Sequence, residues 1–186
     1  EIPLRLVGSE MCIRDRLRKA IKHANLKVFN LAHCNETYNG MGTTLVACLI
    51  TKDIIQVANV GDSSCYGIKF NKVTKITKDH SLVQELLDCG SISKEQAINH
   101  PQKNVITRAI GTEEMVDIDV FDIEKGKFEF FLMCSDGLSN EIDIEEVLSF
   151  EIEEKYLQNI CEKLVDKAKI NGGRDNITVM LFGGEV

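Results

Sequence analysis

Residues 128–138 read Phe128-Glu129-Phe130-Phe131-Leu132-Met133-Cys134-Ser135-Asp136-Gly137-Leu138. The run is mostly apolar, rich in phenylalanine and followed by a turn signal, which predicts a strand buried on both faces. Asp136 stands where this strand ends, and Gly137 allows the chain to turn sharply beside the carboxylate. A charge in that position is costly unless something pairs with it. Its partner is either a metal ion or the backbone amides of a turn, the usual role of an Asp-Gly pair.

A second carboxylate stands at the start of a strand near the C-terminus, in Gly172-Gly173-Arg174-Asp175-Asn176-Ile177-Thr178-Val179-Met180-Leu181-Phe182. If the two strands are antiparallel neighbours, Asp136 and Asp175 come together. The glycine pair would let the loop approach such a site closely. Carboxylate and water ligands suit hard cations such as Mg²⁺ and Mn²⁺, so the pair indicates a metal site.

Five short motifs follow one another along the chain: Gly40-Met41-Gly42-Thr43-Thr44, Ala58-Asn59-Val60-Gly61-Asp62-Ser63, Thr77-Lys78-Asp79-His80-Ser81, Cys134-Ser135-Asp136-Gly137-Leu138 and Gly173-Arg174-Asp175-Asn176-Ile177-Thr178-Val179. In this order they resemble motifs of the PPM family, the metal-dependent serine/threonine protein phosphatases also called type 2C. A sixth stretch, Thr107-Arg108-Ala109-Ile110-Gly111, also fits. The resemblance covers residues 17–186 and is greatest to short bacterial single-domain members.

The pattern of antiparallel strands with a few long helices is α+β, and the resemblance implies two stacked antiparallel sheets with helices on both outer faces. It also implies hydrolysis of phosphoserine and phosphothreonine in proteins, assisted by two Mn²⁺ or Mg²⁺ ions that activate a water. Asp136 and Asp175 would be ligands of one metal, with Asn176 orienting Asp175. Asp79 would belong to a third, weaker metal site, and a helix cap is its alternative role. The partners implied are phosphorylated proteins, the substrates of a cognate serine/threonine kinase.

Residues 1–16 do not fit the pattern that follows, so we expect a non-native leader before a partial catalytic domain at 17–186. In the family, an Asp-Gly motif near the N-terminus supplies an aspartate that bridges the two metals. Asp15 is the only early aspartate, and no glycine follows it. We therefore expect a domain that lacks its first strands and its bridging ligand. The alternatives are a non-catalytic pseudophosphatase that binds phosphoproteins or a kinase, and a structural domain in which both carboxylates cap turns.

Other elements follow from periodicity and turn signals. Apolar residues at three- and four-residue spacing predict an amphipathic helix at 17–33, and others predict helices at 142–148 and 156–168. Residues 81–104 predict a helical flap, in which Ser93 and Gln96 form a capping box. Asp62 is expected to hold a hairpin turn, Arg108 to form a surface ion pair, and the acids of strand 116–123 to face solvent. A β-meander with short connections is expected from the strands at 44–50, 54–60, 63–70 and 73–76.

Bulk properties exclude several classes of protein. A length of 186 residues fits one domain, and a net charge of −7 argues against a general nucleic-acid or anionic-membrane binder. No apolar run approaches the length of a membrane span. Seven cysteines form an odd number without metal-like spacing, and most lie in apolar runs. They are expected to be reduced core residues of a monomeric, cytoplasmic protein.

Overall fold

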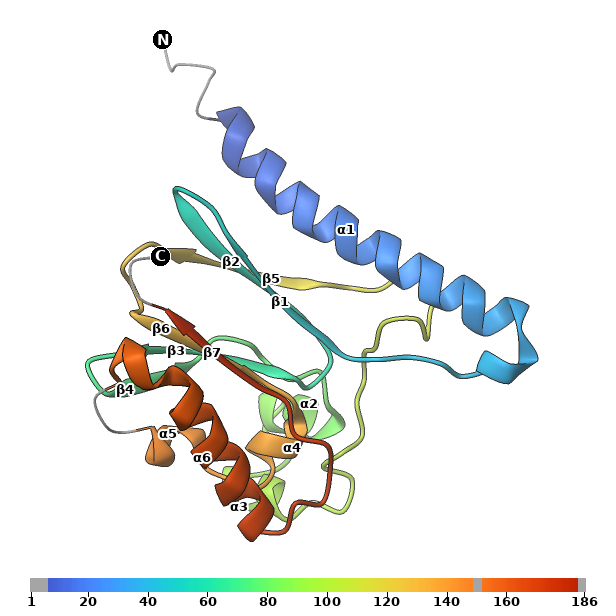
Figure 1. Cartoon of the computed structure of the whole chain (residues 1–186). Coiled ribbons are helices and arrows are strands. Elements are labelled where there is room, and N and C mark those ends of the chain that lie inside the picture. The colour runs from blue at the N-terminus through green and yellow to red at the C-terminus, as the bar shows by residue number, and fades with distance from the viewer. Residues whose placement is uncertain (1–6, 149–151, 184–186) are drawn as a thin grey trace.

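Two antiparallel sheets stack face to face in the computed structural model, which describes residues 7–148 and 152–183, with side chains from Asp15 onward in the first helix (Figure 1). The first sheet has the order β1-β2-β5 and the second the order β4-β3-β6-β7. The expected α+β sandwich is confirmed. The strands are β1 (Leu45–Ile50), β2 (Ile54–Val60), β3 (Ser64–Lys69), β4 (Lys72–Lys75), β5 (Asp119–Glu124), β6 (Phe130–Cys134) and β7 (Val179–Gly183).

Apolar side chains from both sheets meet between them. Val57 and Ile123 of the first sheet pack in one cluster with Cys65 and Phe131 of the second. Phe131 is 1% exposed, and its ring stacks on that of Phe182 with 5.6 Å between centroids. The side chains of β6 are covered on both faces, by the first sheet on one side and by the helices of the outer layer on the other, as the apolar run at 128–134 predicts.

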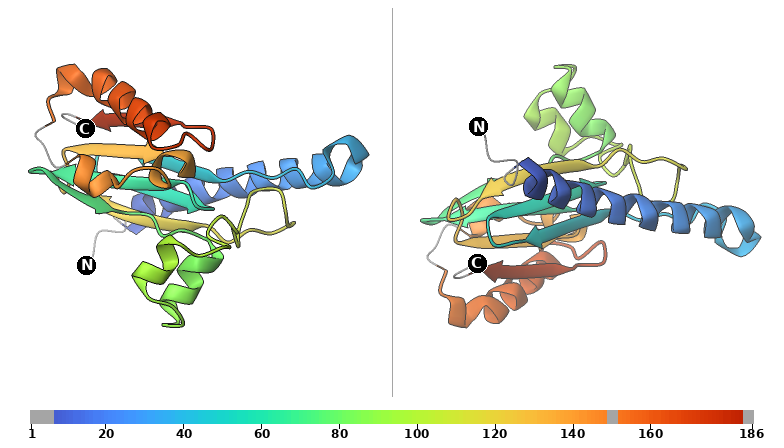
Figure 2. Two further views of the ribbon diagram at one scale, coloured as in Figure 1. Left: turned by 90° about the horizontal axis from the view of Figure 1, so that it is seen from below. Right: turned by 90° about the horizontal axis from the view of Figure 1, so that it is seen from above.

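Helix α1 (Val7–Cys34) covers the outer face of the first sheet (Figure 1). Ile21 packs against Ala58 and Val60 of β2, as the apolar spacing predicts. Leu31 belongs to the same apolar stripe but is 54% exposed. Leu31 is exposed because the C-terminal part of α1 runs past the edge of the sheet and has no strand beneath it (Figure 2). The boundary expected at residue 16 falls inside this continuous helix and stays a prediction.

Three helices cover the outer face of the second sheet, so helices lie on both outer faces as expected (Figure 1). They are α4 (Asp136–Ser139), α5 (Ile144–Val147) and α6 (Leu157–Ile170), and two 3₁₀ turns lie at Glu36–Tyr38 and Glu154–Tyr156. Leu164 of α6 and Leu138 of α4 pack against Leu132 of β6, and all three are almost fully buried. The amphipathic pattern of α6 therefore buries one stripe on the strand that leads to Asp136.

The segment 81–104 forms the expected pair of short helices, α2 (Leu82–Asp88) and α3 (Lys94–Ile98). Ser93 and Gln96 cap α3 reciprocally, as their spacing predicts. A bridge between Ser81 and Ile106 joins the two stems of this flap. The flap projects from the edge of the body opposite to α6 and β7 (Figure 2).

The expected β-meander is wrong at one point. Strands β1 and β2 form one hairpin and β3 and β4 another, but β2 and β3 do not pair with each other. Instead β2 pairs with β5, and β3 pairs with β6 in the other sheet. The chain crosses between sheets at Gly61, whose φ is +106°, a conformation that side-chain-bearing residues rarely adopt. Strand periodicity alone gives no information on which strands pair.

Within residues 7–148 and 152–183, no helix has the length and apolar character needed to cross a membrane.

Replacement of Phe131 by alanine should lower the free energy of unfolding by about 3–5 kcal/mol, because it opens a cavity between the two sheets. Urea denaturation measures this change. Phe70→Ala is the matched control, since Phe70 is 80% exposed in the β3–β4 turn and its loss should cost less than about 0.5 kcal/mol. Equal losses for the two variants would contradict the assigned core.

Candidate active site

Three aspartates lie at the same end of the second sheet because of how its strands are paired. Ser64, at the start of β3, is opposite Cys134, at the end of β6, and Cys134 is opposite Val179, at the start of β7. Asp62 precedes β3, Asp136 follows β6 and Asp175 precedes β7. Strands β6 and β7 are antiparallel neighbours, so the condition under which Asp136 and Asp175 come together is met.

Ser135 joins the two loops that carry Asp136 and Asp175. Its hydroxyl donates to the carbonyl oxygen of Asn176 at 3.1 Å and accepts from the amide of Thr178 at 3.0 Å. The amide of Ser135 also donates to the carbonyl of Thr178 at 3.1 Å. The β6–β7 pairing therefore continues beyond the strands through a side chain, up to the residues beside both carboxylates.

Gly137 allows this approach for a reason different from the one predicted. It lies in α4, with no left-handed backbone conformation. A Cβ at this position would stand 2.3 Å from the carbonyl oxygen of Asn176, a distance that real Cβ atoms do not show. The glycine is needed for close contact between the two loops and not for a sharp turn.

The two carboxylates are oriented by neighbouring amides. The side-chain Nδ2 of Asn140 donates to Asp136 at 3.3 Å. The backbone amide of Asn176 donates to Asp175 at 2.7 Å, so Asn176 contacts Asp175 through its backbone. Among the described residues, neither Asp136 nor Asp175 forms an ion pair with a lysine, arginine or histidine.

The electrostatics of this end of the sheet show that several negative charges lie close together. Partial burial, and next the carboxylate of Asp175, raise the pKa of Asp136. Burial, followed by the carboxylate of Asp136, raises the pKa of Asp62 to about 6. Asp62, interpreted from the sequence as a turn residue that holds a hairpin, thus faces Asp136, and β2 and β3 form no hairpin there. The signal that was available is an aspartate beside a glycine directly after a buried strand, as at Asp136, although the glycine precedes Asp62 and follows Asp136.

Asp79 has a different environment from these three. Both of its carboxylate oxygens lie 2.7 Å from the ammonium group of Lys75. The hydroxyl of Ser64 donates to the same carboxylate at 3.3 Å. The cap of α2 comes from Ser81, so Asp79 does not take the capping role considered as its alternative. A cation at Asp79 would have to compete with Lys75.

The turn that carries Asp62 is held by buried polar side chains. Nδ1 of His80 accepts from the amide of Gly61 at 3.1 Å, and Asn59 donates to the carbonyl of Gly61 at the same distance. On its other side, His80 lies 3.3 Å from Asp119, which also pairs with Arg108 at 3.1 Å. The expected ion pair of Arg108 is confirmed. The acids of β5 do not simply face solvent, because Asp119 is paired here and Asp122 accepts from the buried Gln56.

The donor chemistry of this cluster suits a hydrated hard cation. Its side chains offer carboxylate oxygens, which Mg²⁺ and Mn²⁺ prefer. Within the described residues, no three acidic, histidine or cysteine side chains are arranged to hold a metal by themselves. Mg²⁺ commonly keeps several waters and binds through one or two carboxylates, so Asp136 and Asp175 fit such an ion.

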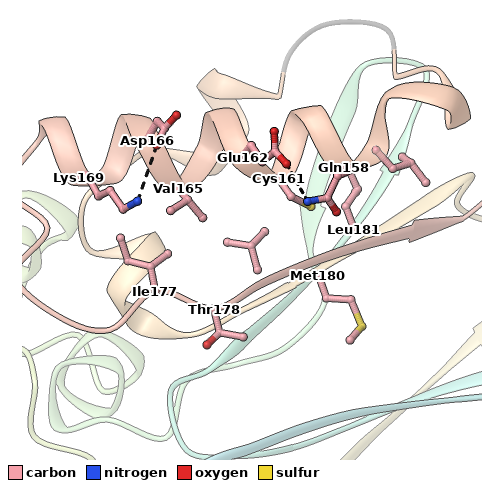
Figure 3. A pocket seen from close by; sticks show the side chains of 12 residues that line it. Gln158, Cys161, Glu162, Val165, Asp166, Lys169, Ile177, Thr178, Met180 and Leu181 are labelled. Carbon is pink, nitrogen blue, oxygen red and sulfur yellow. Dashed lines mark hydrogen bonds and ion pairs between the residues drawn. The ribbon is translucent and has the colours of Figure 1, made fainter.

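A groove of the described residues lies elsewhere. It has a volume of about 890 Å³ and runs between α6 and β7, lined by residues such as Val165, Ile177 and Met180 (Figure 3). Lys169 and Asp166 pair with each other on its rim (Figure 3). The aspartates of the strand ends do not line it, so it is not the candidate active site.

Comparison with known proteins gives the class of the chain. The model of the protein phosphatase 2C family matches residues 8–177. The serine/threonine phosphatase stp of Listeria welshimeri is 43% identical over 172 residues, which are 91% of this chain and 67% of that protein. Protein phosphatase PhpP of Streptococcus pneumoniae is 36% identical over 169 residues, 91% of this chain and 68% of that relative.

A solved structure agrees with the sequence relatives. The crystal structure of the serine/threonine phosphatase Stp1 from Staphylococcus aureus aligns with a TM-score of 0.85 at 35% identity, covering 91% of this chain and 67% of that one. The chain therefore belongs to the protein phosphatase 2C family, and its enzyme class is that of the serine/threonine phosphatases.

Ser135→Ala should lower the free energy of unfolding by about 0.5–1.5 kcal/mol, because the exposed amide of Thr178 and carbonyl of Asn176 exchange their protein partner for water. Urea denaturation gives the magnitude, and faster hydrogen exchange at Thr178 gives the location. Ser139→Ala in the same segment is the control and should change stability by less than about 0.5 kcal/mol. Unchanged exchange at Thr178 would argue against the Ser135 contact.

The raised pKa of Asp62 predicts a pH dependence of stability in the metal-free protein. The folded-state pKa of about 6 lies above the ordinary value, so the folded state binds this proton more tightly than the unfolded state. The stabilisation is complete below about pH 4, and is lost as the pH rises through 6. Asp62→Asn should flatten the decline in unfolding free energy between about pH 4 and pH 6, measured in urea with a chelator present. Asp53→Asn, an exposed acid in the β1–β2 turn, should leave the decline unchanged.

Proposed function

We propose that this chain carries part or all of a metal-dependent site that hydrolyses phosphoserine and phosphothreonine in proteins. Asp136 and Asp175 would hold a Mn²⁺ or Mg²⁺ ion, and Asp62 would add negative charge beside them. The single observation that carries the proposal is the joining of the two aspartate loops by Ser135, with no cationic side chain of the described residues paired to either carboxylate. Two aspartates held together in this way are costly unless a cation binds between them.

The roles of the chain's own residues follow from their contacts. Asn140 and the Asn176 amide each donate to one of the carboxylates and so fix the direction in which its free oxygen points. A bound divalent ion would supply charge neutralisation at phosphorus and a more acidic water. If the site holds two or three ions in total, the second and third need further ligands. Asp62 and Asp79 are the candidates for these ligands. Asp62 is the better of these two, because Lys75 already occupies Asp79.

The substrate class follows from the relatives. Those named above are serine/threonine phosphatases or protein phosphatases, which supports a phosphorylated protein as substrate. A cognate serine/threonine kinase would be the source of its phosphate. The flap, with helices α2 and α3 on an exposed edge, is the proposed contact surface for that protein.

A second candidate function is a non-catalytic module that binds phosphoproteins or a kinase. The observation that favours it is the absence, within the described residues, of a group of three metal-ligating side chains. The two candidates differ in turnover and agree on the location of the site.

Release of phosphate from a phosphothreonine peptide, with Mn²⁺ or with a chelator, tests the proposal. Asp136→Asn and Asp175→Asn should each reduce the metal-dependent rate at least about 100-fold, since metal charge stabilisation of the transition state contributes several kcal/mol. Asp53→Asn should retain the rate, because this exposed residue lies in the β1–β2 turn.

Activity that survives both substitutions or the chelator would reject the proposed site. Binding of the peptide without any release of phosphate would favour the non-catalytic module.

A further inference from the structure

An ion pair anchors the Asp175 loop at a second place, on the side away from Ser135. Glu141 lies two residues after the end of α4, the helix that begins with Asp136. The backbone amide of Glu141 donates to the carbonyl of Leu138 in that helix. Its partner Arg174 directly precedes Asp175. A contact between these two side chains therefore links the Asp136 helix to the neighbour of Asp175.

The geometry of this contact is two-pronged. Nε of Arg174 donates to Oε1 of Glu141 at 2.8 Å and Nη2 donates to Oε2 at 3.2 Å. Two parallel bonds fix the relative orientation of two planar groups, which a single contact does not. The side chain of Asn171 adds a third bond, to the carbonyl of Glu141 at 2.7 Å.

The loop packs closely onto the Glu141 carboxylate. The side chain of Glu141 is only 3% exposed, although that of its partner is 69% exposed. A Cβ on Gly172 would stand 2.9 Å from Oε2 of Glu141, so the glycine lets the backbone pass directly over the carboxylate. The Arg174 guanidinium holds the pKa of Glu141 below its usual range, which keeps the pair charged.

Two contacts hold the chain, one on each side of Asp175. Ser135 fixes the chain after Asp175, through Asn176 and Thr178. Glu141 fixes the chain before Asp175, through Arg174. The guanidinium of Arg174 is exposed but the Glu141 carboxylate is buried, so the pair contributes to stability as well as to geometry. The two parallel bonds also fix the direction of the chain immediately before Asp175.

We propose that the Glu141–Arg174 ion pair is a positioning device that sets the direction of the Asp175 carboxylate for cation binding. Neither residue touches the cation. The inference rests on the proposed function, because it assumes that Asp175 is a metal ligand. Removal of a residue that orients a metal ligand typically lowers metal affinity by 10–100-fold.

Isothermal titration of the whole chain with Mn²⁺ tests this inference without any need for turnover. Arg174→Ala and Glu141→Gln should weaken Mn²⁺ binding by about 10-fold or more. Arg174→Lys should lie between these variants and the unchanged protein, because lysine keeps the charge but loses the fork. The control is Lys155→Ala, whose exposed ion pair with Glu153 at 2.8 Å lies just before the N-terminus of α6, at the end of that helix opposite to the Asp175 loop, and whose loss should leave affinity unchanged.

The melting temperature without metal separates positioning from a general structural role. Arg174→Ala should melt below the unchanged protein in a chelator, because it leaves the buried Glu141 carboxylate without its cation. Positioning predicts that Arg174→Lys, which keeps the charge, melts close to the unchanged protein in a chelator but gains less from added Mn²⁺. Equal Mn²⁺ affinity in Arg174→Ala and the unchanged protein would overturn the inference and leave the proposed function intact. A lower metal-free melting temperature with equal loss in Arg174→Lys would also overturn it, in favour of a structural role. If the unchanged protein binds no Mn²⁺, the proposed function fails, and this inference fails with it.

Discussion

The hydroxyl of Ser135 holds together two loops whose carboxylates repel each other. It bonds to both sides of the Asn176–Thr178 segment, and Gly137 leaves room for that segment to come within contact. The repulsion is visible in the raised pKa of Asp136, to which Asp175 contributes after burial. The β6–β7 pairing and the helices behind it hold this unfavourable arrangement in place. In the absence of a cation, the repulsion between the two carboxylates is not compensated. A bound cation would relieve this repulsion, and its binding is favoured for that reason.

The second sheet provides the rigid base for that arrangement. Strand β6 is buried between β3 and β7, and Leu132 is covered by Leu138 and Leu164. Because the three aspartates follow or precede paired strand ends, their backbone positions are set by the register of the sheet and not by the loops alone. The switch of the chain from one sheet to the other at Gly61 brings Asp62 to the same end, with His80 and Asn59 bonded to the turn.

Much of this fold follows from the sequence, because long apolar runs and amphipathic spacing depend on local features. The strand at 130–134 and the flap helices with their Ser93 cap were predictable for that reason, whereas the nearness of Asp136 to Asp175 followed only on the condition that their strands pair. The pairing of β2 and β3 with other strands was not predictable, since nothing in the sequence between Val60 and Ser64 distinguishes a hairpin from a crossing to the other sheet. The role of Asp62 was missed with it. The contact of Gly137 was also beyond the sequence, because a glycine selected for close approach looks the same as one selected for a turn.

The three aspartates lie far apart along the chain, at positions 62, 136 and 175. Their cluster exists only after strands from the beginning, middle and end of the domain have paired. A cation that needs this cluster has nothing comparable to bind in a partly folded chain, so it adds stability that is absent from the folding transition state. Interactions of that kind slow unfolding and leave the folding rate almost unchanged. A bound ion would thus increase the kinetic stability of the protein, because it extends the lifetime of the native state without making the chain fold faster.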